Sequence, residues 1–266
     1  MDKTIEACLK SIVNNNPAEI IIIDGKSRDK TLSIARKYTD KIFSDEGRGP
    51  SYAHQLGAEQ ASQQYIAFVD ADIVLPAGTL SRMLIELEFY GYADIQALWH
   101  AASRSTYWDR AQDWHVRTFQ SRKNGGLSAA LLKKDIVLDI GFDSSLRARF
   151  AGFAGDDYDF MLKLAKHGYT SGNSSVVVYH HHRADFRSVM KRQFQLGRSS
   201  PYLMRRHGLY HPGLWSPLAM VYWIIACIVR GKPWFAPYFI MAWGVQTAGL
   251  LKGFTELRYE ATILGL

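Results

Sequence analysis

The expected fold is decided by the stretch Tyr65-Ile66-Ala67-Phe68-Val69-Asp70-Ala71-Asp72. Its apolar first part, which is rich in Ile, Phe and Val, predicts a buried strand that ends at two carboxylates separated by one alanine. In an open α/β sheet, ligands bind beyond the carboxyl ends of the strands. Carboxylates at such an end can hold a hard divalent cation, although two solvated aspartates at a strand exit would give the same pattern.

Alternating strand and helix patterns precede this stretch. The apolar run at residues 19–23 predicts a buried parallel strand, and a polar loop follows it and leads into a helix. A short strand at residues 41–43 and a helix through residues 53–61 come next. This order predicts the α/β class, with a doubly wound, mostly parallel sheet that has helices on both faces.

Composition limits the possible partners. The 266 residues can bury one substantial core with an appendage. The formal net charge of +7 favours an anionic partner such as nucleotide phosphates, nucleic acid or a membrane surface. The chain has only two cysteines, Cys8 and Cys227, which lie far apart and argue against a disulfide framework or a zinc site.

The last third of the chain changes character. Two uncharged runs, residues 214–229 and 234–251, are separated by a short basic segment. Each run is near the short end of what spans a bilayer. We predict an α/β domain in residues 1–200 and a membrane-associated helical hairpin in residues 201–266, with the α/β domain on the cytoplasmic side. A buried helical pair, or helices that lie in the membrane interface, are the alternatives.

Five short motifs follow one another in a fixed order. They are Ile23-Asp24-Gly25-Lys26-Ser27-Arg28-Asp29-Lys30-Thr31, the segment from Gly47-Arg48-Gly49-Pro50 through Ala53-His54-Gln55-Leu56-Gly57, Phe68-Val69-Asp70-Ala71-Asp72, Gly141-Phe142-Asp143, and Gly155-Asp156-Asp157-Tyr158-Asp159. In this order they resemble a nucleotide-binding loop, a glycine loop with its helix, a metal-binding Asp-x-Asp, an acceptor-side turn and an acidic pair at a helix start. Together they resemble the family 2 glycosyltransferases, which are nucleotide-sugar-dependent enzymes with a GT-A fold.

The resemblance implies a role for each matching residue. The nucleotide sugar would be bound by Asp24, Ser27, Arg48, Asp70 and Arg198. Mg²⁺ or Mn²⁺ would be held by Asp72, Asp70 and His180. Asp157 would be the general base, and the acceptor side would include Asp156, Gly126 and Phe142.

Each assignment has a simpler alternative. Asp24 could only close a turn, and Asp156 and Asp157 could only cap a helix. Arg198 could contact anionic lipid instead of a diphosphate. The three consecutive histidines from His180 could be a solvated strand end or a weak metal tract.

The function that the resemblance implies is transfer of a single sugar, with inversion, from a nucleotide-diphosphate donor to an acceptor hydroxyl. A polyprenyl-linked or saccharide acceptor and membrane lipid are the expected partners, and nucleic acid is not, because the basic residues cluster next to the apolar runs. The Gln-x-x-Arg-Trp motif of processive synthases does not occur. The strand with a Pro-x-Tyr-Asn-Glu motif that opens the family is expected to be missing, so a catalytically inactive nucleotide-sugar-binding or scaffold protein is the alternative.

Overall fold

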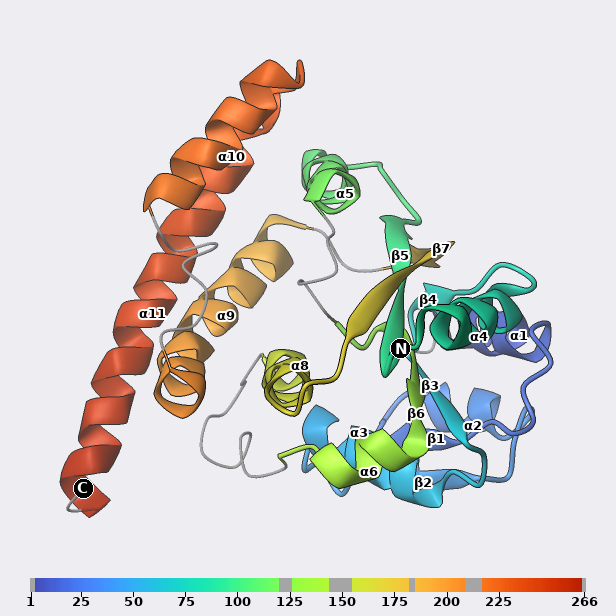
Figure 1. Cartoon of the computed structure of the whole chain (residues 1–266). Coiled ribbons are helices and arrows are strands. Elements are labelled where there is room, and N and C mark those ends of the chain that lie inside the picture. The colour runs from blue at the N-terminus through green and yellow to red at the C-terminus, as the bar shows by residue number, and fades with distance from the viewer. Residues whose placement is uncertain (1–2, 120–125, 144–154, 182–184, 209–216, 265–266) are drawn as a thin grey trace. The chain divides into compact units, whose positions relative to one another are not determined.

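The computed structural model describes residues 3–119, 126–143, 155–181, 185–208 and 217–264. The chain divides into two compact units, which are described separately (Figure 1). The first unit holds the strands and most of the shorter helices. The second is built from the three C-terminal helices together with Ser105–Gln112.

The first unit alternates strands and helices. Its strands are β1 (Ile22–Asp24), β2 (Ile42–Ser44), β3 (Tyr65–Val69), β4 (Ile73–Val74), β5 (Asp94–Ala101), β6 (Ala129–Lys133) and β7 (Ser171–His180). Its helices are α1 (Ile5–Val13), α2 (Thr31–Ala35), α3 (Pro50–Gln60), α4 (Thr79–Tyr90), α6 (Lys134–Ile140) and α8 (Asp156–Lys166). Helix α5 (Tyr107–Phe119) begins in the second unit and ends in the first.

The strands form two sheets, and the prediction of a mostly parallel sheet is wrong. β1 and β2 form a parallel pair. The larger sheet has the order β3-β6-β5-β7-β4, in which only β5 and β7 are parallel. The sequence pattern misled because an apolar run without alternation reports burial on both faces, and it does not report strand direction.

Helices cover both faces of the larger sheet, as predicted (Figure 1). Successive side chains of β6 point to opposite faces. Ala130 and Leu132 pack into one core with residues from α3, α6 and α8. Ala129 and Leu131 pack into the other core with residues from α4 and β7. Since both faces are buried, polar groups collect at the ends of the strands.

The second unit is a helical assembly of α9 (Phe186–His207), α10 (Pro217–Val229), the short 3₁₀ helix η1 (Pro233–Phe235) and α11 (Ala236–Leu264). The Asp185 carboxylate caps α9 by accepting the Ser188 N–H at 3.0 Å. α10 and α11 lie side by side, and Trp223 stacks on Phe239 with ring centroids 5.3 Å apart. The predicted pair of helices is therefore present.

The predicted transmembrane helices are not supported. Within the residues that the structure describes, no helix is both long enough and apolar enough to cross a membrane. The 13 residues of α10 reach only about 20 Å, whereas the hydrocarbon core is about 30 Å thick. The longer α11 interrupts its apolar run with Gly244, Gln246 and Gly249. Residues 214–216 of the first predicted run lie outside the described residues.

Glycines allow α9 and α11 to approach each other closely. A Cβ atom on Gly249 would lie 2.2 Å from the Phe194 carbonyl oxygen, and one on Gly197 would lie 1.9 Å from the Gln246 carbonyl oxygen. Both distances are far shorter than van der Waals contact, so neither position accepts a larger residue without separating the helices. Gly244, on the same helix, would meet nothing within 4 Å.

These contacts predict opposite effects for two equivalent substitutions in α11. Gly249→Ala should destabilise the second unit by about 1–3 kcal/mol, because its methyl group overlaps the α9 backbone. Gly244→Ala, the matched control, should stabilise it by about 0.5–1 kcal/mol through helix propensity. Chemical unfolding followed by circular dichroism would measure both. Equal effects of the two substitutions would contradict the packing described for α9 and α11.

Candidate active site

The first cluster of chemically active side chains contains Asp70, Asp72 and His180. The two aspartates lie in the turn between β3 and β4, and His180 is the last residue of β7. Antiparallel pairing sets Ile73 opposite His180, and the His181 N–H donates to the Asp72 carbonyl oxygen at 2.7 Å. As a result, the Nε2 atom of His180 lies 3.1 Å from Oδ1 of Asp72.

The donor set of this cluster suits a divalent cation. One ligand atom from each of the three side chains lies within 4.8 Å of the other two. Carboxylate oxygens suit Mg²⁺ and Mn²⁺, and the added imidazole favours Mn²⁺. Trp99 packs edge-on against the His180 ring at 5.1 Å and restricts its orientation. The geometry is thus compatible with the predicted metal site.

Helix α1 supports the turn that carries the two aspartates. The Cys8 thiol, which is 2% exposed, lies 3.5 Å from the Asp70 carbonyl oxygen. Ser11 accepts the Leu75 N–H at 3.0 Å just beyond β4. Burial, together with the nearby charges of Asp72 and Asp70, raises the pKa of Cys8 to about 12. The thiol is therefore protonated and acts as a small packing group.

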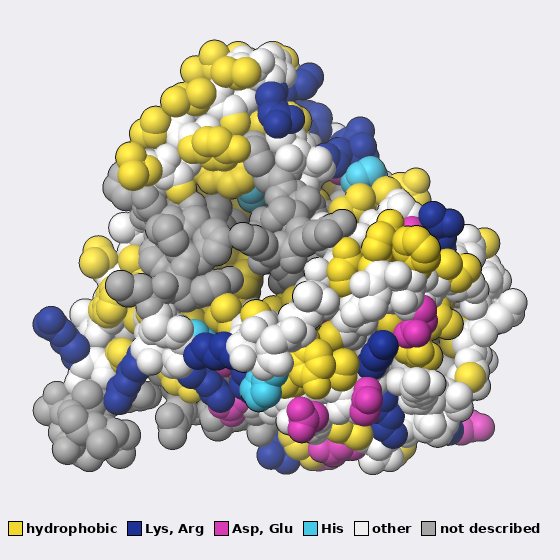
Figure 2. Space-filling model, viewed as in Figure 1, with side chains coloured by type: hydrophobic (Ala, Val, Ile, Leu, Met, Phe, Trp, Pro, Cys, Tyr) yellow, Lys and Arg dark blue, Asp and Glu magenta, His cyan; other side chains and the backbone are white. Residues whose placement is uncertain are grey.

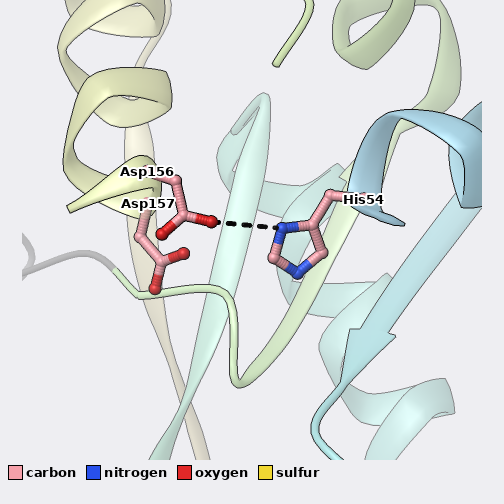
Figure 3. Close-up of side chains that lie close together, drawn as sticks. All are labelled: His54, Asp156 and Asp157. Carbon is pink, nitrogen blue, oxygen red and sulfur yellow. Dashed lines mark ion pairs between the residues drawn. The ribbon is translucent and has the colours of Figure 1, made fainter. Parts of the chain in front are cut away.

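The second cluster contains His54, Asp156 and Asp157 (Figure 3). His54 comes from α3, and the two aspartates come from the first turn of α8. The Nδ1 atom of His54 lies 3.9 Å from Oδ2 of Asp156, and ligand atoms of all three residues lie within 4.8 Å of one another. Both carboxylates are favoured by the positive end of the α8 dipole.

The backbone before β6 orients Asp157. The Leu127 N–H donates to Oδ2 of Asp157 at 3.3 Å, and the neighbouring Gly126 N–H donates to Oε1 of Gln96 at 3.1 Å. A Cβ atom on Gly126 would lie 3.1 Å from the Gln96 Nε2 atom and 3.7 Å from the Asp157 carboxylate. The predicted acceptor-side residues Gly126 and Asp156 thus lie close to the predicted base, Asp157.

Two phenylalanines surround the His54 ring. Its centroid lies 4.9 Å from that of Phe68 and 5.1 Å from that of Phe142. Burial lowers the pKa of His54, against the opposing influence of the Asp156 and Asp70 charges. The imidazole is consequently neutral at neutral pH. Phe68 lies near the end of β3 and Asp70 follows two residues later, so β3 connects the two clusters.

The predicted nucleotide-binding loop after β1 is organised by two aspartates. Asp24 accepts the Ser27 N–H at 3.0 Å, so its carboxylate closes a turn. The Asp45 N–H donates to the Asp24 carbonyl oxygen at 3.0 Å. The Asp45 carboxylate accepts the N–H groups of Gly47 at 2.7 Å and Gly49 at 3.0 Å. These bonds fix the glycine loop; contact of Asp24 and Ser27 with a nucleotide stays a prediction.

Three other predicted residues take part in packing or ion pairs. The Arg48 guanidinium lies over the Tyr52 ring at 3.6 Å. Arg198, in the second unit, forms an ion pair with Glu256 at 2.7 Å. Phe142 is buried, and its ring stacks on an α8 phenylalanine at 4.3 Å. Nucleotide binding by the two arginines and acceptor contact by Phe142 stay predictions.

Sequence reasoning assigned no role to Asp45, Gln96 or His54. Asp45 carried a signal, because an aspartate just before a glycine pair often accepts backbone N–H groups. Gln96 lies inside a strand and His54 inside a helix, and neither position suggests the partners that the fold supplies. Tertiary structure alone identifies these two residues.

A protein-family model matches the N-terminal part of the chain. The model of glycosyl transferase family 2 matches residues 2–151, which is more than half of the chain. Glycosyltransferase AglE of Haloferax volcanii is 22% identical, over 74% of this chain and 68% of that protein. The dolichyl N-acetyl-alpha-D-glucosaminyl phosphate 3-beta-D-2,3-diacetamido-2,3-dideoxy-beta-D-glucuronosyltransferase of Methanococcus voltae is 23% identical, over 98% of this chain and 87% of that protein.

Solved structures show the same fold. Glucosyl-3-phosphoglycerate synthase of Mycobacterium tuberculosis superposes with a TM-score of 0.53 at 16% identity, covering 80% of this chain and 78% of that chain. Residues 1–349 of TarS from S. aureus, in complex with UDP-GlcNAc, give a TM-score of 0.53 at 15% identity, covering 99% of this chain and 89% of that chain. The mixed α/β architecture is thus that of GT-A glycosyltransferases.

The buried position of Cys8 predicts a thiol that resists labelling. In a Cys227→Ala variant, which leaves Cys8 as the single cysteine, a disulfide reagent at pH 7.4 should react at least about 10³-fold more slowly than with a free cysteine, because the thiolate is scarce and covered. The same variant in urea should react fully. Rapid labelling of the folded protein would show that α1 is not packed against the Asp70 turn.

Proposed function

Because the chain belongs to glycosyl transferase family 2, we propose that it moves a single sugar from a nucleoside-diphosphate donor to an acceptor hydroxyl with inversion. The observation that carries this proposal is the placement of two clusters at one edge of the sheet. Asp70, Asp72 and His180 lie at the ends of β3 and β7, and the helix-borne cluster of His54, Asp156 and Asp157 is held by the Leu127 backbone just before β6. One cluster suits a metal-bound diphosphate, and the other offers a carboxylate to an acceptor hydroxyl.

On the donor side, Asp70, Asp72 and His180 would hold Mg²⁺ or Mn²⁺. When bound, the ion would neutralise the negative charge that develops on the departing nucleoside diphosphate. The synthase of Mycobacterium tuberculosis has structures with Mn²⁺ or Mg²⁺ and UDP, which supports the same arrangement here. Asp24, Ser27 and Arg48 would contact the nucleotide from the loops after β1 and β2.

On the acceptor side, Asp157 would act as the general base. The acceptor oxygen attacks the anomeric carbon while the bond from that carbon to the diphosphate breaks, and the acceptor proton passes to the Asp157 carboxylate. A single displacement of this kind inverts the anomeric centre. The hydrogen bond from Leu127 holds the carboxylate in place, which supports this role.

The acceptor is proposed to be lipid-linked, and the protein to lie on an anionic membrane surface. One face of α10 exposes large apolar side chains: Leu218, Val221, Tyr222, Ile225, Ile228 and Val229. Figure 2 shows hydrophobic side chains gathered over this helix, with basic side chains beside them. Arg230 and Lys232 follow the helix, and Lys232 lies 5.0 Å from the Trp234 ring. Such a face suits the interface of an anionic bilayer.

Asp72 and Asp157 should separate donor binding from transfer. Asp72→Asn should abolish Mn²⁺-dependent binding of one nucleotide among UDP, GDP and CDP, measured by isothermal titration. Asp157→Asn should bind that nucleotide within about twofold of the wild type, yet release nucleoside diphosphate from the sugar donor about 10²–10⁴-fold more slowly. Acceptors for this assay would be polyprenyl-linked and free saccharides.

The exposed Asp139 on α6 provides a matched control, since Asp139→Asn should change neither quantity. Donor binding without release, with every acceptor tried, would favour a nucleotide-sugar-binding protein. If the wild type binds no nucleotide in a metal-dependent way, the transferase proposal is wrong.

The apolar face of α10 should control membrane binding. The double variant Ile225→Gln/Val229→Gln should lower partition onto vesicles of phosphatidylcholine and phosphatidylglycerol at least about tenfold. Each substitution removes more than about 1 kcal/mol of the favourable free energy of burying an apolar side chain in the membrane. Arg230→Gln should cost about 1 kcal/mol, roughly fivefold, and only with anionic vesicles. Vesicle flotation would measure both.

Phe89→Gln is the control for this experiment, because Phe89 is 79% exposed on α4 of the first unit. It should leave partition unchanged. If it lowers binding as much as the α10 double variant, the membrane contact is not made by α10.

A further inference from the structure

Two buried polar atoms of the second cluster have no hydrogen-bond partner among the described residues. They are Nδ1 of His54 and Oδ2 of Asp156. The atoms face each other at 3.9 Å, which is too far for a hydrogen bond (Figure 3). A buried polar atom without a partner costs about 1–3 kcal/mol. Two such atoms that face each other can act as two ligands of one group bound between them.

The spacing of these atoms fits a metal ion better than a hydroxyl group. Ligand bonds to ions such as Zn²⁺ are about 2.0–2.2 Å long, so two ligands of one ion lie at most about 4.4 Å apart. A bridging hydroxyl at about 2.8 Å from each atom, with a tetrahedral angle, would hold them about 4.6 Å apart. At the same tetrahedral angle an ion would hold its two ligands about 3.3–3.6 Å apart. The observed 3.9 Å therefore lies closer to the value for an ion than to the value for a hydroxyl group.

The chemistry of the three side chains agrees with an ion. An imidazole nitrogen and carboxylate oxygens from Asp156 and Asp157 lie within 4.8 Å of one another. The positive end of α8 opposes a cation, but its charge is equivalent to only about +0.5. Two carboxylates outweigh it. Phe68 and Phe142 hold the imidazole in place, so the nitrogen is positioned before an ion arrives.

We propose that His54, Asp156 and Asp157 form a second divalent-cation site, separate from Asp70, Asp72 and His180. One nitrogen and two carboxylate ligands select Mn²⁺, Co²⁺ or Zn²⁺ over Mg²⁺. Binding of the ion requires no donor and no acceptor. If Asp157 is the base of the proposed transferase, an ion held by its carboxylate competes with the acceptor hydroxyl; this consequence rests on the proposed function.

Titration of the untagged full chain with Co²⁺ tests the site. Calorimetry would give the number of bound ions, and visible absorption would report nitrogen ligation. His54→Gln should bind one Co²⁺ fewer per chain than the wild type. Asp156→Asn should lose the same ion, and it keeps a side chain that can cap α8. Asp72→Asn combined with His54→Gln should lose two ions.

His167 supplies the matched control. Its Nδ1 atom lies 2.8 Å from the Lys163 carbonyl oxygen, outside both clusters. His167→Gln should bind as many ions as the wild type. The histidines from His180 onward are unchanged in all single variants at position 54, 156 or 167, so any Co²⁺ that they hold cancels in the comparison.

Unchanged Co²⁺ stoichiometry and affinity in both His54→Gln and Asp156→Asn would overturn the proposal. Circular dichroism would confirm that each variant is folded, and Asp156→Asn gives an independent answer if His54→Gln unfolds. The Co²⁺ titration contains no nucleotide sugar, so its result does not depend on whether the protein transfers a sugar. Equally, loss of the second ion site would not affect Mn²⁺-dependent nucleotide binding at Asp72.

Discussion

The antiparallel insertion of β6 between β3 and β5 is the constraint on which the rest of the first unit depends. It sets Val69 opposite Ala129, and the Asp70 N–H donates to the Ser128 carbonyl oxygen at 2.9 Å. The end of β3 and the start of β6 therefore meet at one edge of the sheet. The Asp70 turn and the Leu127 backbone that holds Asp157 share this edge for that reason. A parallel β6 would have put its first residues at the opposite edge.

The remaining strands complete the same edge. β5 runs parallel to β7, so Ala101 lies opposite His180 at their shared end, and β4 sets Ile73 opposite His180 as well. Gln96 lies opposite Ala130 and reaches the Gly126 backbone from the neighbouring strand. Burial of both faces leaves this edge as the place where charged side chains can gather. The position of Asp72 beside His180 and the contact of the Leu127 backbone with Asp157 follow from strand order and direction.

The sequence revealed the parts of this arrangement that depend on local pattern. An apolar run followed by Asp70 and Asp72 identified the strand end, and an acidic pair after Gly155 identified the start of α8. Strand direction could not be read, since burial on both faces looks the same in parallel and antiparallel strands. β4 has only two residues, Ile73 and Val74, so it has no period to detect.

Residues whose partners are distant in the sequence could not be predicted either, because a local pattern does not show tertiary contacts. Nothing in the neighbourhood of His54 indicates that it will face Asp156, which is about a hundred positions later in the chain.

The apolar C-terminal runs led to the wrong prediction of transmembrane helices for a different reason. Their residues serve both close helix packing and an exposed apolar face. Gly249 on α11 packs closely against α9. Because a close contact of this kind needs small residues instead of large apolar ones, it lowers the hydropathy of α11. The large apolar side chains left exposed are those of the short α10. A helix too short to span a bilayer can still lie along its surface, because lying flat requires one apolar face and no particular length.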